Sequence, residues 1–492
     1  MKFWKTTVLA MLLLAMLLPL AGCGSAESTE TAQNDAPAEE TETVETETEV
    51  ACDLPDTDWD GRNFHVLGYD DGTYTQFTNF EICVEEANGE VVNDAIFNRN
   101  LGIDEQYNAT VSQNLLTDIV GSLKSSVMAG DALYDCVFID MRNIGTAVLQ
   151  GYLLDMNALP YMDFTKPWWN PDVNAVVSVE DRLFFTTSDF SLRDKSRTYI
   201  LTYNRDMVNN HALGDPVALV DEGKWTMDLV RQWTEAVSQD ADGDGVMDPL
   251  KNDVYGIAMD SYNGFTAFLA GCGEICWTKD DADRYTLDMT GDRTISAIER
   301  VTELTCNTDT AFYCNDLNDW SASGNSFRGG YALFMTSFPH SLATLSESCE
   351  FDYGVIPFPK YDENQEKYNA LADLWCMMFG VPACAGDPAF SAFMLEALSY
   401  SSMTTSLPAY YEISCKKKYT YDEDSARMLD LIFDGILYDP AMIYNFNGFY
   451  QVLCNTLPST KKNTFVSLHE SSSVSEQKFI SKLLDTAAEL NQ

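Results

Sequence analysis

The stretch that decides the fold is YDCVFID, residues 134–140. Between its aspartates, Cys136 to Ile139 form an apolar run with no alternation of polar and apolar residues. An uninterrupted run of this length is typical of a strand that is buried on both faces, as the strands of parallel sheets are. We therefore predict that residues 134–140 form a central strand of a parallel sheet.

The segments on either side of this stretch alternate between strand and helix patterns. We expect strands at 62–68 and 109–113, and helices at 90–107, 115–128 and 144–149. This order is an α/β pattern with a parallel sheet, so the fold class is α/β. Thr226 begins another helix after Gly-Lys-Trp, and further apolar runs predict strands within 197–207, 254–259, 329–337, 351–360 and 374–381.

The first twenty-three residues carry an export signal. Lys2 and Lys5 precede an apolar run, and the small residues Ala21 and Gly22 lead into Cys23. These features describe a secretory signal, and the ending resembles a lipoprotein signal in which the cysteine is acylated. An ordinary signal with a chance cysteine is the alternative. We expect removal of residues 1–22 and a lipid-anchored, acidic, disordered tether over 23–52, at the extracellular face of the bacterial cytoplasmic membrane.

The composition of the chain argues against some classes of binding partner. The chain has 492 residues, 46% of them hydrophobic, which is enough for two domains or one two-lobed unit. Its 76 acidic residues outnumber 30 basic ones and give a net charge of −46. Nucleic acids and anionic lipid surfaces both require clustered Lys and Arg, so we expect neither as a partner. We expect the protein to contact the membrane through its lipid anchor only.

Thirteen cysteines are present, and twelve remain when Cys23 is assigned to lipid. An even number permits disulfides, although cysteines inside apolar runs pack as small hydrophobes. The cysteines inside apolar runs are Cys136, Cys376 and Cys454. Two pairs are candidates for disulfides, with free thiols equally consistent: Cys272 with Cys276, and Cys306 with Cys314.

An Asp-rich loop follows the helix that begins after Thr226. Carboxylates at positions 1, 3, 5 and 9, with glycine at position 6, match the first nine places of a calcium loop. Lys251 stands at position 12 instead of the usual glutamate, and Asp253 could supply the missing carboxylate. The sequence predicts a structural Ca²⁺ site, with a metal-free surface turn as the alternative and no other cofactor required. Its ligands would come from Asp240, Asp242, Asp244, Val246 and Asp248.

The order of these features resembles a known family. After the leader, the tether and the α/β segment come Tyr-Asn-Arg-Asp (203–206), Gly-Lys-Trp-Thr (223–226), the Asp-rich loop, Tyr-Ala-Leu-Phe-Met (331–335) and Tyr-Gly-Val-Ile-Pro-Phe-Pro-Lys (353–360). In this order they are similar to family 1 extracellular solute-binding proteins of bacterial ABC importers, the maltose-binding-protein type. The resemblance covers residue 53 to the C-terminus.

This resemblance implies two α/β lobes, hinge strands and a ligand cleft between the lobes. We place the first lobe at 53–197 plus 338–353 and the second at 198–337 plus 354–492. The resemblance also implies a monomer that delivers a small solute, a mono- or oligosaccharide, to an ABC permease. A non-sugar solute, or service to a membrane sensor or adhesion system, is the alternative.

Ligands of open parallel sheets bind beyond the carboxyl ends of the strands. Asp70, Asp140 and Arg142 follow strands in this way and suit a polyhydroxylated ligand, because charged groups form strong hydrogen bonds to hydroxyls; strand-end solvation or a local ion pair is the alternative. Aromatic rings pack against the C–H faces of sugars, although such rings are also common in cores. The further candidates are Asp189, Tyr262, Trp277, Trp320, Phe338 and Phe449.

An enzyme is disfavoured by the sequence. The four histidines form no His-Glu-x-x-His motif, and Gly-x-Ser-x-Gly is absent from the chain. Acidic residues are abundant, so a glycosidase carboxylate pair is the remote alternative, but abundance is not evidence for a pair. We predict a binding protein with no catalytic residues.

Overall fold

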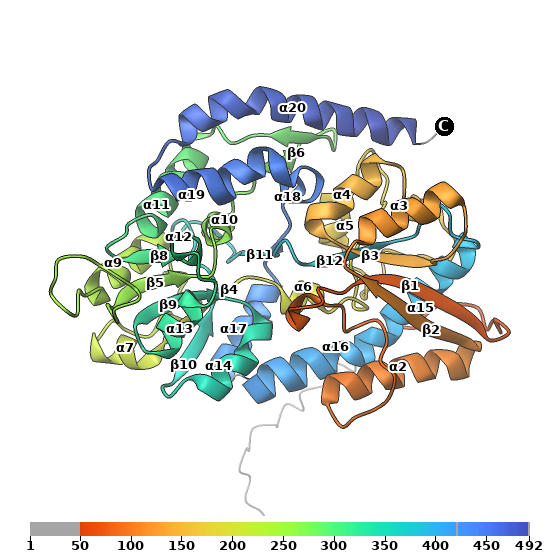
Figure 1. Cartoon of the computed structure of the whole chain (residues 1–492), viewed down its shortest axis with the longest axis horizontal. Coiled ribbons are helices and arrows are strands. Elements are labelled where there is room, and N and C mark those ends of the chain that lie inside the picture. Colours follow the sequence, from red (N-terminus) through yellow and green to blue (C-terminus); the bar gives the residue numbers. More distant parts are fainter. Residues whose placement is uncertain (1–49, 420–421, 491–492) are drawn as a thin grey trace, which may run out of the picture. The chain divides into compact units, whose positions relative to one another are not determined.

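The first lobe is built on a four-stranded sheet in the order β12-β3-β1-β2 (Figure 1). The computed structural model describes residues 50–419 and 422–490, so the expected signal and Cys23 lie outside the described residues, as does all of the tether before Val50. β1 pairs in parallel with β2 and β3, and all five residues of β3 are buried, as expected of a central strand. The strands are β1 (Arg62–Tyr69), β2 (Ala109–Leu116), β3 (Cys136–Asp140) and the antiparallel β12 (Met377–Gly380).

Helices pack around this sheet and end where the sequence provides stop signals. Asn108 and Gly130 follow two of these helices with left-handed backbone, at φ 48° and 63°, a conformation that ends helices. Asp118 caps the second of them by accepting the Gly121 N–H at 2.9 Å. The helices are α2 (Val91–Tyr107), α3 (Ile119–Ala129), α4 (Met141–Leu149), η2 (Met156–Ala158), α5 (Pro171–Val177) and α15 (Pro388–Thr404).

The second lobe has a five-stranded mixed sheet in the order β10-β4-β9-β5-β8. β5 pairs in parallel with β8 and β9, whereas β4 is antiparallel to β9 and β10. The strands are β4 (Ile200–Asn204), β5 (Tyr255–Met259), β8 (Ala311–Tyr313), β9 (Ala332–Ser337) and β10 (Tyr353–Ile356). The helices are α7 (Arg205–Asn210), α8 (Pro216–Asp221), α9 (Met227–Val237), α10 (Asn263–Gly271), α11 (Asp292–Thr305), α12 (Cys314–Leu317), α13 (Ala322–Arg328), η3 (Pro339–Ser341), α14 (Leu342–Ser348) and α17 (Glu423–Phe433).

Three chain segments connect the two lobes. β11 (Ala370–Leu371) pairs in parallel with β13 (Ile436–Leu437), and the Tyr199 N–H donates to the Leu371 carbonyl at 2.9 Å. The Asp373 N–H in turn donates to the Arg197 carbonyl at 2.9 Å. Arg197 directly follows the short helix α6 (Arg193–Ser196), so one hydrogen-bonded bundle of extended chain holds the end of this helix.

The C-terminal region packs against both lobes. α18 (Pro440–Tyr444) lies so close to α4 that a Cβ built on Gly145 would be 2.4 Å from the Ile443 carbonyl oxygen. In Figure 1 the long helix α20 lies above the β6–β7 hairpin and α18. The elements are the π-helical η4 (Ala409–Tyr419), η5 (Phe446–Tyr450) and η6 (Val452–Thr456), with α16 (Ser406–Pro408), α19 (Leu457–Thr460), α20 (Phe465–Glu489), β6 (Trp277–Lys279) and β7 (Tyr285–Leu287).

The strand pairing differs from the predicted lobe boundaries in two places. Residues 338–353 were expected in the first lobe, but they connect β9 to β10 in the second sheet, and Leu342 and Leu345 belong to that lobe's core. Residues 354–492 were expected in the second lobe, but β12 pairs with β3 and α15 packs on α2. Apolar strands of either lobe have the same composition, so only their partners reveal the lobe to which they belong.

The adjacent tryptophans Trp168 and Trp169 share one buried acceptor. Both indole N–H groups donate to the carboxylate of Glu396 on α15, at 2.9 Å each, and all three side chains are at most 3% exposed. Burial raises the pKa of Glu396 to about 7, although these hydrogen bonds oppose the rise.

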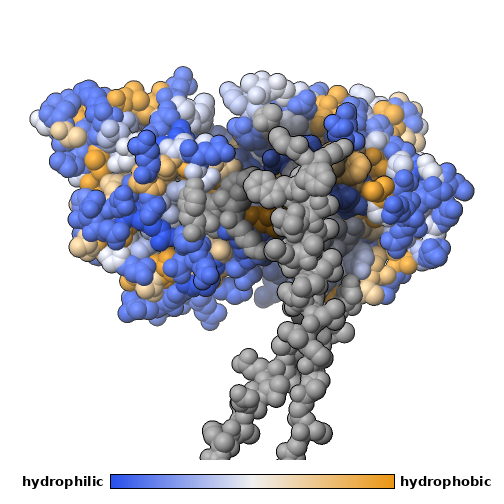
Figure 2. All heavy atoms as spheres, turned by 90° about the horizontal axis from the view of Figure 1, so that it is seen from below, coloured by the Kyte–Doolittle hydropathy of each residue, from blue (hydrophilic) through white to orange (hydrophobic). Residues whose placement is uncertain are grey.

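Most of the surface shown in Figure 2 that belongs to described residues is hydrophilic, in keeping with the acidic composition. Among the described residues, no helix is long and apolar enough to cross a membrane. The twelve cysteines from Cys52 onward are all free thiols, so neither pair considered as a disulfide is joined: Cys272 and Cys276, and Cys306 and Cys314.

Candidate ligand-binding site

Asp140 and Arg142 lie where β3 passes into α4. Asp140 is the N-cap of α4: its carboxylate accepts the Arg142 N–H at 3.2 Å, the Arg142 Nε at 2.9 Å and the Asn143 Nδ2 at 2.8 Å. These bonds fix the Arg142 side chain, which is 26% exposed. The charges of Asp140 and Arg142 are therefore paired with each other, which matches the local ion pair considered as the alternative to ligand binding.

An aromatic group of the first lobe adjoins this ion pair. The Arg142 guanidinium lies 3.6 Å from the ring centre of Trp375, a half-buried residue in the turn between β11 and β12. Phe77, at the end of η1 (Thr75–Phe77), stacks on the same indole with ring centres 4.4 Å apart and an interplanar angle of 29°. Tyr69, the last residue of β1, is 5.7 Å from it.

The second lobe continues this row of rings and guanidinium groups. The Arg197 guanidinium lies 5.1 Å from the Phe77 ring centre and 4.3 Å from that of Phe338, which follows β9. Phe338 in turn contacts Tyr199, with ring centres 4.4 Å apart. Arg197 is therefore placed between rings of the two lobes, and its guanidinium is neutralised by a buried ion pair with Asp373.

We call this set the aromatic row; its members are Arg142, Trp375, Phe77, Arg197, Phe338 and Tyr199. His340 stacks on Phe338 at 5.4 Å, and Arg197 Nη1 lies 3.3 Å from its Nε2. Burial and the neighbouring arginines lower the pKa of His340 to about 3. The ring is thus neutral, its Nδ1 donates to the Ser196 carbonyl at 3.0 Å, and the row carries no unpaired histidine charge.

A polar cluster lies beside the row in the second lobe. Asp260, directly after β5, accepts hydrogen bonds from the hydroxyls of Thr336 at 2.6 Å and Ser261 at 3.1 Å. Burial raises the pKa of Asp260 to about 6. The Tyr199 hydroxyl has no hydrogen-bond partner, and its burial, helped by the negative charges of Asp260 and Asp373, raises its pKa. This cluster offers both acceptors and an unused donor to a hydroxylated ligand.

A family model for bacterial extracellular solute-binding proteins matches residues 104–408, more than half of the chain. The chain belongs to this family. A comparison with curated protein sequences gives no match.

Solved structures of such proteins share the fold. This solute-binding protein is similar to UspC from M. tuberculosis, with 14% identity and a TM-score of 0.54 over 86% of this chain and 100% of that one. A sugar transporter from Rhizobium etli in an open conformation has 13% identity and a TM-score of 0.55, covering 87% and 99%. An ABC substrate-binding protein from Listeria monocytogenes, in complex with cycloalternan, has 11% identity and a TM-score of 0.51, covering 88% and 98%. The two-lobed fold expected from the sequence is confirmed.

The structure brings three of the predicted ligand residues of this solute-binding protein to the aromatic row: Asp140, Arg142 and Phe338. Asp70 follows β1 in the same region, where its carboxylate accepts the Gly72 N–H at 2.9 Å and the Thr78 hydroxyl at 3.0 Å. These two hydrogen bonds hold the loop after β1 together, and a ligand contact of Asp70 stays a prediction.

Asp189 and Tyr262 have other surroundings. Burial raises the pKa of Asp189 to about 7, opposed by the positive charge of Lys195. Tyr262 lies after β5 and donates its hydroxyl to Asp316 at 2.7 Å, with the Lys461 ammonium 5.3 Å from its ring centre. No interaction recorded for the described residues joins either side chain directly to the row.

The remaining aromatic candidates divide between surface and core. Trp320 is 65% exposed between α12 and α13. Trp277 and Phe449 are at most 1% exposed in the hydrophobic core, where the Trp277 indole N–H donates to Glu476 at 2.9 Å. The structure does not bring these three side chains to the aromatic row.

Sequence reasoning missed Phe77, Trp375 and Arg197. The apolar pattern of 374–381 predicts a strand that includes Trp375, but this residue precedes β12 in a turn. Asp373, just before it, is the signal that could have separated this turn from the strand. Phe77 follows the polar end of the first strand, where a ligand residue could have been sought.

A groove of about 670 Å³ lies elsewhere in the second lobe. It has no aromatic side chain among its described lining residues, and its Arg231 already pairs with Glu235 at 2.9 Å. Groove size alone does not supply ring stacking, so the aromatic row is the better candidate for a ligand site. The lining consists of Arg231, Glu235, Glu299, Thr302, Glu303, Cys306, Asn307, Lys461 and Asn463.

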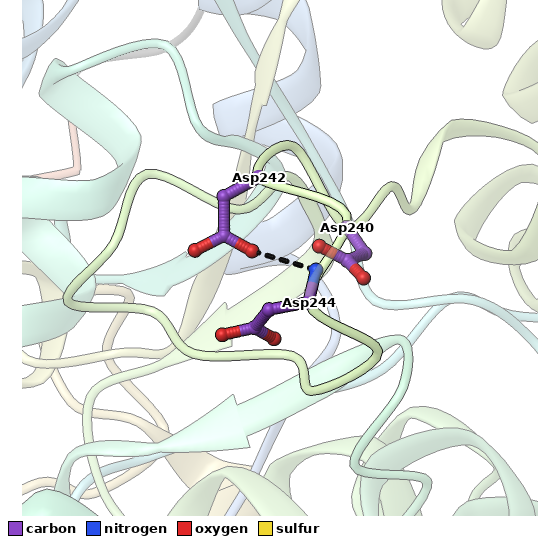
Figure 3. A group of neighbouring side chains, drawn as sticks. All are labelled: Asp240, Asp242 and Asp244. Atoms are coloured by element: carbon purple, nitrogen blue, oxygen red, sulfur yellow. Dashed lines mark hydrogen bonds between the residues drawn. The ribbon is translucent and has the colours of Figure 1, made fainter.

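The Asp-rich loop gathers three of the predicted calcium ligands. Carboxylate oxygens of Asp240, Asp242 and Asp244 lie within 4.8 Å of one another (Figure 3). Lys251 donates to Asp244 at 2.7 Å, and its ammonium is 4.0 Å from Asp242. Asp253 is fully buried and accepts the N–H groups of Ala241 and Asp248 at 2.8 Å each, so it closes the loop instead of completing the carboxylate group.

Proposed function

We propose that this protein is a lipid-anchored receptor that binds a mono- or oligosaccharide and delivers it to an ABC permease. The observation that carries the proposal is the aromatic row between the strand ends of the two lobes. Aromatic faces pack against the C–H faces of sugar rings, while the surrounding carboxylates and hydroxyls form hydrogen bonds to their hydroxyl groups.

The charge state of the row favours a neutral ligand. Asp140 pairs with Arg142 at 2.9 Å, and Asp373 pairs with Arg197. A charged ligand would break one of these pairs or remain uncompensated in a poorly solvated site, at a cost of several kcal/mol. A neutral polyhydroxylated ligand avoids that cost, and sugar-binding proteins among the structural relatives support the same ligand class.

The test is a ligand screen of the purified protein by thermal shift and calorimetry, with sugars, amino acids, peptides and polyamines as separate classes. Trp375→Ala should weaken the binding of a sugar by about tenfold, or about 1.4 kcal/mol, because a stacking face is lost. Trp59→Ala is the matched control, since this half-buried indole packs on Phe390 outside the row, with ring centres 4.9 Å apart.

A shift caused only by amino acids or peptides would replace the sugar with the non-sugar alternative. Sugar turnover by the purified protein would instead support the remote glycosidase alternative. Delivery is tested separately, by uptake of the labelled sugar in cells that carry Cys23→Ser. If the variant protein is still made but uptake is lost, anchored delivery is supported, whereas unchanged uptake contradicts it. Sugar-dependent signalling without uptake supports the sensor alternative.

We also propose that the Asp-rich loop binds a structural Ca²⁺ ion. The gathering of three carboxylates supports this proposal, because Ca²⁺ takes oxygen ligands from such loops. Asp242→Ala should then abolish any Ca²⁺-dependent rise in melting temperature, whereas an unchanged response would place the ion elsewhere.

A further inference from the structure

The members of the aromatic row differ in how firmly the fold holds them. Arg142 is fixed by Asp140, Arg197 by Asp373, and Phe338 directly follows β9. Trp375 lies in a short turn, where the Cys376 N–H donates to the Asp373 carbonyl at 2.8 Å and the Cys376 carbonyl accepts the Met141 N–H at 3.1 Å. These positions belong to strand ends or to hydrogen-bonded hinge chain, so they form a fixed frame.

Phe77 comes instead from a loop at the protein surface. The loop after β1 is closed at its base by the Asn79 N–H on the Tyr69 carbonyl at 2.9 Å. Its tip is exposed, and nothing lies within 4 Å of a Cβ built on Gly72. The Phe77 side chain, itself half-buried, reaches from this loop into the fixed frame.

The Phe77 ring fills the space that a ligand ring would need. Trp375 has a guanidinium 3.6 Å and a phenyl ring 4.4 Å from its ring centre, and two groups at these distances cannot share one face. Both faces of the indole are therefore covered, one by Arg142 and the other by Phe77. On the side of Arg197, the guanidinium lies 5.1 Å from the Phe77 ring centre. A sugar can stack on Trp375 only after one of its two covers has moved.

Of the two covers, Phe77 is the one that can leave at low cost. Moving Arg142 would break its ion pair with Asp140, whose carboxylate is 5% exposed and would be left without its cationic partner. Moving the Phe77 side chain breaks no hydrogen bond of that side chain and forfeits its contacts with the Trp375 ring and the Arg197 guanidinium. A six-membered sugar ring has a shape similar to that of the phenyl ring and can recover those contacts through its C–H face.

We propose that Phe77 is a displaceable occupant of the sugar site, and that one six-membered ring of the ligand replaces it between the Trp375 indole and the Arg197 guanidinium. The inference rests on the proposed sugar-binding function and adds a built-in competitor to it. Phe77 lowers the affinity for every ligand that uses this position, and it keeps the indole covered when no sugar is bound.

The experiment measures sugar affinity by calorimetry for the protein and for Phe77→Ala, with glucose, galactose, xylose and maltotriose as the probes. Removing a competing ring should tighten binding by about 2- to 10-fold, the equilibrium factor of one aromatic pair. Phe77→Leu keeps most of the apolar volume and guards against a loop that collapses. Phe80→Ala is the control, because Phe80 is half-buried in the same segment and lies outside the row.

The gain should disappear in a Trp375→Ala background, since the competition acts through that indole. Weaker binding by both Phe77 variants would overturn the inference and make Phe77 an ordinary ligand contact, while leaving the proposed function standing. Unchanged binding would also overturn it. If no probe sugar binds to the protein or to any variant, the proposed function and this inference fail together.

Discussion

Tyr285→Phe tests how the β6–β7 hairpin is fastened to the first lobe. The carbonyl oxygens at the C-terminal end of α5 have no partner within their own helix. Tyr285 donates its hydroxyl to the Val176 and Ser178 carbonyls at 2.7 and 3.0 Å, and Lys279 donates to the Ala175 carbonyl at 2.6 Å. The hairpin thus adds donors to the C-terminal end of α5, where the Ser178 N–H and the Tyr444 hydroxyl already donate to the Asn174 and Val177 carbonyls.

The expected cost follows from these bonds. Phenylalanine keeps the buried ring and removes only the hydroxyl, so packing is preserved. Two carbonyl oxygens in a partly buried contact lose their donor, which costs about 1–3 kcal/mol of the free energy of unfolding. The Lys279 ammonium remains at the negative end of the helix dipole, where it continues to stabilise the contact.

The measurement is urea unfolding of the protein, of Tyr285→Phe and of Tyr161→Phe as the exposed control, since Tyr161 is 43% exposed. Hydrogen exchange at α5 and β7 locates the loss. A Tyr285→Phe midpoint equal to that of Tyr161→Phe would refute the reasoning. A large loss without faster exchange at α5 would show that the hydroxyl acts through another part of the core.

Three further outcomes are expected. Glu396 binds its proton more tightly in the folded state, where its pKa is about 7, than in the unfolded state, where it is 4.5. The free energy of unfolding should therefore fall by up to about 3 kcal/mol as the pH rises from about 4.5 to 7. Glu396→Gln should flatten this dependence in urea titrations across that pH range. Gly145→Ala should lose about 1–3 kcal/mol because its Cβ would meet an α18 carbonyl, whereas Gly102→Ala, with open space around it, should gain up to about 1 kcal/mol in the same assay. Lys251→Glu supplies the position-12 carboxylate of the calcium loop and removes the ammonium group that is bonded to Asp244. Calorimetry should therefore show Ca²⁺ binding at least about tenfold more tightly. Weaker binding would contradict the calcium proposal.

The sequence predicted those features that depend on local pattern. The β3 strand could be recognised from Cys136–Asp140 alone, because a continuous apolar run needs a sheet with both faces covered. Thr226 occupies the predicted N-cap of α9, although its side chain forms no capping hydrogen bond. The lobe to which β12 belongs could not be predicted, because strand partners are chosen by packing over long sequence separations.

The residues of the candidate ligand site also differ in whether local sequence pattern could predict them. Asp140 and Arg142 were predicted because their chemistry stands next to their strand in the sequence. Trp375 and Phe77 were not, because a ring in a turn becomes a stacking face only when the hinge and a loop bring it to a partner almost three hundred positions away. Arg197 shows the reason most clearly: it gains its role from rings contributed by both lobes. Because each of these rings comes from a different lobe, no single stretch of the sequence could have indicated that Arg197 joins them.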